Sequence, residues 1–332
     1  MKVTQLYVYP IKSLRGISLQ HAKLDRQGVQ YDRRFMLLKT HDDGHLEPIE
    51  VVRFPACALF TPEIVDGNIV VRCQIPEEPL VPPAPEQKTT LHIPLDPDIS
   101  GLGTVEVDLY GSKCLGYCMP DKYSSWFSSC FGLKAMLVYI GDARRPVLGT
   151  MSPAVAQEQK TQGWLSSMTS YLTGTGHPQD PHWLTFTCVA AFLITTESSV
   201  KDVSGRLPEG EEMDMRKFRP NIVIDGGEPF EEDFWGEIAV DGGPRLVLTG
   251  NCGRCASINV DYKTGRPGTG ESGKVLKKLM RDRRVDRGNR WSPIFGRYGF
   301  LLDDEAEISV GNVVAVTKSL EERCVWDWPP YK

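Results

Sequence analysis

Short apolar runs set apart by Gly, Pro, Asp and Asn dominate the hydrophobic pattern of this chain. The runs lie at residues 5–9, 34–38, 69–73, 104–109, 135–140, 221–224, 245–248 and 313–316. This pattern is typical of strands joined by turns. Helical patterns are fewer, and we predict helices at 124–131 behind an Asp121 N-cap, at 196–203 and at 270–284. The balance predicts a mostly β (α+β) fold of two packed β-barrel-type domains with peripheral helices.

Two stretches between these runs have the composition of surface insertions. Residues 76–97 contain seven prolines, which excludes a central strand. Residues 149–181 are rich in Ser, Thr, Gly and Gln. We place a domain boundary near residue 130, so that residues 1–130 form one barrel and residues 131–332 form a second domain.

Length and charge narrow the class of protein. A chain of 332 residues is about right for two domains, and its net charge of -5 argues against a nucleic-acid binder. The cysteine count is nine, an odd number, and neither a signal peptide nor a transmembrane run of roughly 18 apolar residues is present. These features predict a reducing compartment, most simply the cytoplasm.

The pair Cys252-x-x-Cys255 admits three interpretations. A structural zinc site needs four ligands, and only Cys114-x3-Cys118 offers a second pair. A thioredoxin-like pair would precede a helix, whereas residues 256–261 alternate like a strand. One thiolate could instead bind a soft, high-valent metal, with Arg254 favouring its ionised form. Spacing alone leaves these three open.

A glycine-rich stretch close behind this pair resembles a phosphate-binding loop. Residues 268–274 fit the spacing G-x-x-x-x-G-K, but Val275 follows where a hydroxyl must hold magnesium. We therefore expect a flexible loop that leads into a helix.

Three basic elements flank predicted strands. They are Pro10-Ile11-Lys12-Ser13, Asp32-Arg33-Arg34-Phe35 and Phe218-Arg219-Pro220-Asn221. Each element puts a cation at a strand end, where barrel mouths bind ligands. Position alone favours three unrelated surface cations.

Together with the cysteine pair, Val260-Asp261, Thr264-Gly265 and the late run Ser292-Pro293-Ile294-Phe295-Gly296-Arg297-Tyr298, these elements resemble the MOSC superfamily. More narrowly, they resemble the mitochondrial amidoxime-reducing components and their bacterial relatives. The resemblance runs from residue 3 to about residue 317 and implies a MOSC N-terminal β-barrel domain followed by a MOSC domain. It also implies that molybdenum cofactor (molybdopterin with Mo) is held between the domains.

The resemblance assigns roles to six residues. Cys255 matches the metal ligand and catalytic cysteine. The cofactor-binding residues that match are Lys12, Ser13, Arg34, Arg219 and Asn221. Cations suit this task because a phosphate needs charge-assisted donors.

The implied activity is a molybdenum-dependent reductase of N-hydroxylated compounds such as amidoximes and hydroxylamines. The resemblance implies an external electron donor, such as a b5-type cytochrome with its NADH-dependent reductase. The motifs contain no His, so Asp261 is the nearest candidate proton donor, although a turn role suits it better. The alternative function is a cofactor carrier or a sulfuration-related MOSC protein without reductase turnover.

The chain departs from the family in three respects. It begins at the first predicted strand without the anchor of mitochondrial members, which favours the cytoplasm, although a mitochondrial association is compatible with the family. Ile258-Asn259 stand where animal relatives carry a Thr-Thr pair. No iron–sulfur spacing for a fused ferredoxin is found.

Overall fold

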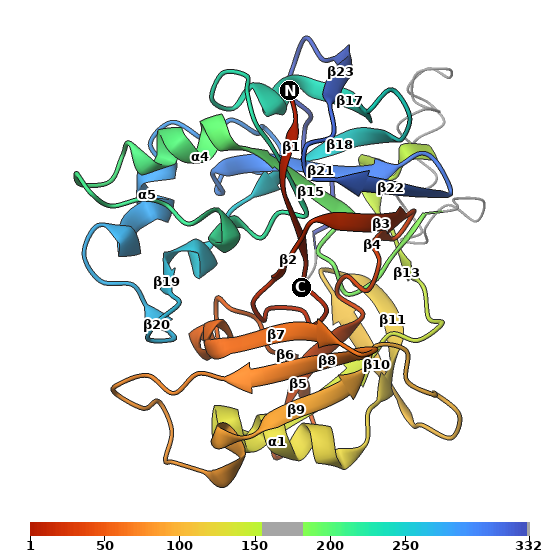
Figure 1. The fold of residues 1–332 in the computed structure, drawn as a ribbon, viewed down its shortest axis with the longest axis vertical. Coiled ribbons are helices and arrows are strands. Elements are labelled where there is room, and N and C mark those ends of the chain that lie inside the picture. The colour runs from red at the N-terminus through yellow and green to blue at the C-terminus, as the bar shows by residue number, and fades with distance from the viewer. Residues whose placement is uncertain (155–181, 331–332) are drawn as a thin grey trace.

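The computed structural model describes residues 1–154 and 182–330 (Figure 1). The chain is mostly strands with few helices, as the sequence predicts. All eight apolar runs form strands, because alternating side chains bury one face of each run against a core.

The N-terminal region folds into a nearly closed barrel. A five-stranded sheet in the order β10-β11-β12-β5-β6 faces a three-stranded sheet in the order β7-β8-β9. These strands are β5 (Phe35–Thr40), β6 (Leu46–Pro48), β7 (Phe60–Val65), β8 (Asn68–Cys73), β9 (Thr90–Pro94), β10 (Thr104–Leu109), β11 (Ser112–Cys118) and β12 (Ala135–Tyr139). Helix α1 (Asp121–Phe131) closes the barrel, with Phe131 stacked on Phe60 at 4.3 Å between ring centroids.

The second half is built on an eight-stranded sheet in the order β2-β1-β16-β15-β21-β18-β17-β23. These strands are β1 (Val3–Val8), β2 (Ile17–Leu19), β15 (Phe192–Thr196), β16 (Ile222–Ile224), β17 (Trp235–Val240), β18 (Arg245–Gly253), β21 (Ile294–Leu301) and β23 (Val314–Ser319). The first strand of the chain thus belongs to the sheet of the second half (Figure 1). A further sheet, β22-β3-β4, pairs β22 (Glu305–Ser309) with β3 (His21–Asp25), which is followed by β4 (Gly28–Val29).

Short elements complete the fold. The two-residue strands pair as β13 (Arg145–Pro146) with β14 (Trp183–Leu184) and as β19 (Val260–Asp261) with β20 (Arg266–Pro267). The 3-10 helices are η1 (Pro55–Leu59), η2 (Pro85–Lys88), η3 (Gly149–Met151), η4 (Met215–Phe218), η5 (Glu231–Phe234), η6 (Ala256–Asn259) and η7 (Ser272–Lys274). None of the helices among the described residues is long and apolar enough to cross a membrane.

The helix predictions are confirmed in part. Helix α4 (Glu197–Ser204) begins as expected, with the Thr196 hydroxyl accepting a hydrogen bond from the amide of Ser199. Asp121 is not the N-cap of α1. It is the first helical residue, where its carboxylate interacts favourably with the helix dipole.

The predicted helix at 270–284 is wrong. Only η7 and the short helix α5 (Val275–Leu279) form there. α5 ends at Leu279, and beyond it the side chain of Arg283 reaches the buried carboxylate of Asp233 at 2.8 Å. This long-range ion pair stabilises the non-helical segment after α5.

Three further predictions concern residues 76–97, 256–261 and 149–181. Residues 76–97 contain no central strand, since β9 lies at the edge of its sheet. The strand predicted at 256–261 is wrong for its first part, where η6 forms instead. The Asn259 side chain accepts a hydrogen bond from the amide of Leu276 at 3.0 Å and so joins η6 to α5. Most of the predicted insertion at 149–181 lies outside the described residues.

Candidate functional site

A cavity of about 320 Å³ takes its lining from both sides of residue 130, and we call it the central cavity. Its volume lies at the lower end of the roughly 300–1,000 Å³ that is usual for small-molecule sites. Five of the six residues with roles implied by the family resemblance line it. They are Lys12, Ser13, Arg219, Asn221 and Cys255.

Strand pairing explains why residues more than 200 positions apart meet here. Lys12 and Ser13 follow β1, and Arg219 and Asn221 precede β16, which pairs with β1 in antiparallel register. The carbonyl of Asn221 accepts a hydrogen bond from the amide of Tyr7 at 2.9 Å, so the two strand ends are joined directly. The predicted convergence of these segments is therefore present in the structure.

Two arginines enclose Tyr9 beside the cavity. The guanidinium carbons of Arg33 and Arg219 each lie 4.4 Å from the centroid of the Tyr9 ring. Both residues have left-handed backbones, with φ of 58° at Arg219 and 48° at Arg33, and Ser13 adds a third at 72°. Such conformations cost about 1–3 kcal/mol each and persist where the surrounding structure holds them.

Arg34, the remaining cation of the predicted set, does not line the central cavity. Its guanidinium donates to the hydroxyl of Tyr139 at 3.0 Å and to the carbonyl of Gly141 at 2.7 Å. Arg33 lines the cavity instead, and its guanidinium donates to the side chain of Asn221 at 3.1 Å. Both residues precede β5, and the left-handed backbone at Arg33 separates the directions of the two side chains.

Lys12 is held by several groups at once. Its ammonium donates to the carbonyl of Phe186 at 3.1 Å, and it lies 3.8 Å from the carboxylate of Glu50. Burial lowers the pKa of Lys12, while Cys188 and Glu50 act in the opposite direction. The ammonium is therefore an anchored part of the cavity wall.

The two predicted cysteines differ sharply. Cys255 is exposed, with its Sγ 3.2 Å from the Ser257 hydroxyl. Cys252 is 3% exposed, and burial raises the pKa of its thiol although Arg254 acts against this. Of this pair, Cys255 is therefore the one that offers an accessible sulfur to a bound group.

Arg254, which was expected to favour the ionised form of the thiol, binds two backbone carbonyls instead. Its guanidinium donates to the carbonyls of Phe218 at 2.8 Å and Phe295 at 3.0 Å. These two rings stack at 3.7 Å and lie 5.2 and 5.7 Å from the guanidinium. Its Nη2 is buried and has no hydrogen-bond partner among the described residues.

Sequence reasoning missed a third cysteine of the cavity, Cys188, and two groups near it, Glu50 and Tyr110. None of the three belongs to a motif. Asp261, the candidate proton donor, is not in the cavity lining and accepts a hydrogen bond from the amide of Lys263 at 2.7 Å. It therefore has the turn role that the sequence favoured.

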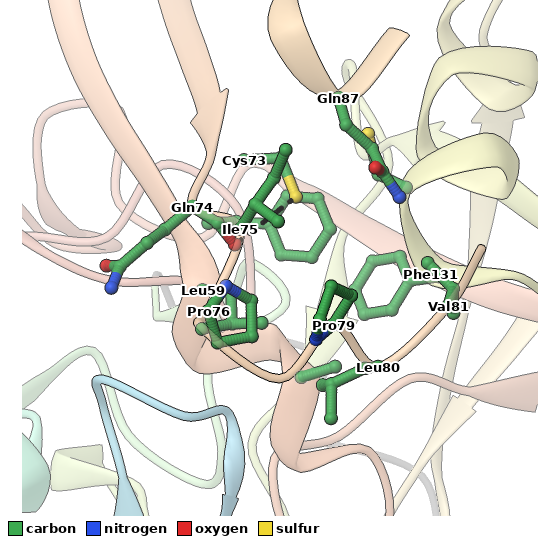
Figure 2. Close-up of a pocket in the computed structure, with 13 residues that line it drawn as sticks. Leu59, Cys73, Gln74, Ile75, Pro76, Pro79, Leu80, Val81, Gln87 and Phe131 are labelled. Carbon is green, nitrogen blue, oxygen red and sulfur yellow. Dashed lines mark hydrogen bonds between the residues drawn. The ribbon is translucent and has the colours of Figure 1, made fainter. Parts of the chain in front are cut away.

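Two other hollows lack this convergence of chemistry. One, of about 20 Å³, lies under the proline-rich segment and is lined by groups such as Pro76, Leu80 and Phe131 (Figure 2). Cys73 lies there with its thiol near the carbonyl of Gln74 (Figure 2). The other, of about 330 Å³, lies over β3 and β22 and has no cysteine or arginine in its lining.

The described residues do not place three or more His, Cys, Asp or Glu side chains close enough to hold a metal ion on their own. This geometry gives the zinc interpretation of the Cys252–Cys255 pair no support within the described part. The pair also precedes no α-helix of a βαβ unit, since β18 pairs with antiparallel neighbours.

The architecture is that of a mostly β protein whose central cavity is lined by residues from both halves of the sequence. Residues 1–134 match the MOSC N-terminal beta barrel domain and residues 181–315 match the MOSC domain. The chain belongs to the MOSC-domain family, as its motifs predict.

The chain is similar to curated proteins of two kinds. The mitochondrial amidoxime reducing component 2 of Rattus norvegicus is 27% identical over 94% of this chain and 82% of its own length. The molybdenum cofactor sulfurase of Oryza sativa subsp. japonica is 25% identical over 94% of this chain but only 34% of its own length. The chain thus spans about a third of that sulfurase. Among solved structures, the YUAD protein from Bacillus subtilis covers 94% of the chain with a TM-score of 0.37 and 8% identity, too distant a likeness to support an argument.

Proposed function

We propose that the central cavity binds molybdenum cofactor and that the chain reduces N-hydroxylated compounds such as amidoximes and hydroxylamines. The observation that carries the proposal is the meeting of Lys12, Ser13, Arg219, Asn221 and Cys255 in one cavity. The family resemblance links these same residues to the cofactor, and relatives along 94% of the chain are named for amidoxime reduction and for the molybdenum cofactor.

The cavity fits such a group chemically. The Arg254 Nη2 and the Thr187 hydroxyl lie in its lining and lack hydrogen-bond partners within the described part of the chain. An unsatisfied buried donor costs about 1–3 kcal/mol, so an oxygen-rich ligand would stabilise both. Arg33 and Arg219 supply the positive charge that a phosphate needs.

Each residue has a distinct role in this proposal. Cys255 is the metal ligand, because its sulfur is accessible. Arg33 replaces Arg34 in the set that binds the anionic part of the cofactor, together with Arg219 and Lys12. When bound, the cofactor supplies two-electron chemistry that removes oxygen from an N–O bond. Replacing that bond by N–H needs two protons and releases water.

The remaining parts of the proposal concern partners and organisation. Electrons come from an external donor such as a b5-type cytochrome and its NADH-dependent reductase. We propose that residues 1–130 and 131–332 supply the two units that enclose the cofactor, with β1 and β2 of the first range joining the eight-stranded sheet of the second. We propose a cytoplasmic location for the protein.

The test combines metal analysis, a fluorescence assay for oxidised pterin, and reduction of benzamidoxime by a reduced viologen. We expect molybdenum and pterin in the purified chain and turnover with the viologen. Cys255→Ala should abolish turnover, whereas Cys252→Ser should keep both metal and activity. The reverse result would exchange the roles of the two cysteines.

Two other results would reject the reductase. If both variants kept molybdenum and activity, the cysteine pair would have no part in the reaction. If the chain held pterin, passed it to a cofactor-free enzyme and never reduced benzamidoxime, the carrier function would replace the reductase.

A further inference from the structure

Cys188, which belongs to none of the sequence motifs, lines the central cavity beside charged and polar side chains. Its Sγ lies 4.0 Å from the ammonium of Lys12 and 3.9 Å from the hydroxyl of Tyr110. The same hydroxyl donates to the carboxylate of Glu50 at 2.5 Å. One thiol, one ammonium, one phenol and one carboxylate therefore form a connected cluster, which we call the Cys188 cluster.

The charge balance of this cluster favours a thiolate. Arg145 lies directly behind Cys188, is fully buried, and donates to the carbonyls of Cys188 and Thr187 at 2.7 Å each. Its other donors meet the carbonyls of Thr185 and Leu109, so among the described residues no carboxylate forms an ion pair with this arginine. Glu50 acts on Lys12 and Asp108 acts more weakly on Arg145, and an ionised sulfur at Cys188 adds negative charge beside both buried cations.

The titration of Cys188 agrees with this balance. Burial raises the pKa of its thiol, but the Lys12 ammonium leads the opposing effects and the pKa is lowered overall. The titratable or charged groups that act on Cys188 from the surrounding elements are Lys12, Arg33, Glu50, Tyr110, Arg145, Cys252 and Tyr298. Arg33 adds positive charge but is paired with the carboxylate of Asp32.

A second observation points to a ligand at this place. Thr187 is 2% exposed and precedes Cys188 in the cavity wall. Its hydroxyl has no hydrogen-bond partner among the described residues. Since buried hydroxyls are normally satisfied, this hydroxyl can bond to a group that enters the cavity.

We propose that Cys188 is a nucleophilic thiolate and the cavity's covalent attachment site for small soft electrophiles, in particular low-molecular-weight disulfides. The Cys188 sulfur attacks one sulfur of the disulfide, a new S–S bond forms, and the old S–S bond breaks. The departing thiolate takes a proton from water, so the disulfide is the only oxidant needed. The attached group would occupy the space beside Lys12 and exclude other ligands from it.

This inference goes beyond the proposed function and needs no molybdenum, so it can be tested without the cofactor. The full chain is produced in a host that makes no molybdopterin and is treated with limiting iodoacetamide or glutathione disulfide at neutral pH. Peptide mapping by mass spectrometry then follows all nine cysteines. We expect Cys188 to be modified first, with a pH–rate midpoint below that of free cysteine, and Cys57 to stay unmodified.

Cys57 reports on folding because it is fully buried and burial raises its pKa to about 12. Lys12→Met should raise the pKa of the Cys188 thiol. Each unit of that rise should slow the labelling of Cys188 at neutral pH by roughly tenfold. The difference should vanish at alkaline pH, where both thiols are ionised. The matched control is Lys23→Met, which removes an exposed lysine and should change nothing.

Three results would overturn the inference. One is faster labelling of Cys255 or Cys73 than of Cys188. Another is an unchanged rate in Lys12→Met at neutral pH. The third is a rate in that variant that stays low at alkaline pH, which would show altered access instead of altered ionisation.

Discussion

Arg33→Ala tests the assignment of the cavity cation most directly. The guanidinium of Arg33 forms a close ion pair with Asp32, whose side chain is fully buried. It also donates to the Asn221 side chain at 3.1 Å and the Arg219 carbonyl at 3.2 Å. After its removal, the amide of Tyr9 at 2.8 Å is the partner that remains to the Asp32 carboxylate.

The expected cost follows from this unpaired charge. Removing one partner of a buried ion pair typically destabilises a protein by about 3–5 kcal/mol. Arg34→Ala is the matched control, because Arg34 donates only to neutral oxygens of Tyr139 and Gly141 and should cost about 1–3 kcal/mol. We expect Arg33→Ala alone to lose pterin, since Arg33 alone of the two lines the cavity.

Urea unfolding followed by tryptophan fluorescence measures the stability, and pterin per folded chain measures the site. Because instability alone could release pterin, Asp32→Asn is added to Arg33→Ala to remove the unpaired charge. The double variant should regain most of the stability and still lack pterin. The reasoning is refuted if Arg34→Ala loses pterin while Arg33→Ala keeps it, or if the double variant regains both.

Two further predictions concern stability. Asp233→Asn should lower the free energy of unfolding by about 3–5 kcal/mol, because its fully buried carboxylate pairs with Arg283 and Arg323 at 2.8 and 2.7 Å. Urea unfolding checks this against Glu63→Gln, which removes an exposed ion pair and should change little. Burial raises the pKa of Glu232 from 4.5 to about 7, so the folded chain holds this proton more tightly than the unfolded chain. Stability should therefore fall by about 3 kcal/mol as pH rises from about 4.5 to 7, and Glu232→Gln should lose this dependence; parallel pH profiles would contradict it.

The strands and the site segments could be predicted because their signals are local or carried by family motifs. An apolar run bounded by Gly or Pro predicts a strand wherever it pairs, and the motifs mark Lys12, Arg219 and Cys255 without knowledge of the fold. The choice between Arg33 and Arg34 was not predictable in the same way. It depends on the left-handed backbone at Arg33, which the contact with Tyr9 and Asn221 holds in place.

Features that depend on distant contacts were missed for a common reason. Beyond the short helix α5, Arg283 pairs with Asp233, fifty positions away, a contact that the local helical pattern does not record. Cys188 is in no motif, and its chemistry comes from Lys12 and Arg145, which tertiary packing brings to it. No periodicity or spacing records such encounters.

The place of β1 has a consequence for how this protein is made. β1 leaves the ribosome well before its partner, β16, which lies more than 200 residues later in the chain. β1 must therefore wait, unpaired on its β16 side, until most of the chain has been synthesised. The barrel formed by the following residues can fold in the meantime, while β1, which is not part of the barrel, stays attached to it through the backbone. Lys12 and Arg219 therefore meet in the central cavity only after β16 has been synthesised and has paired with β1.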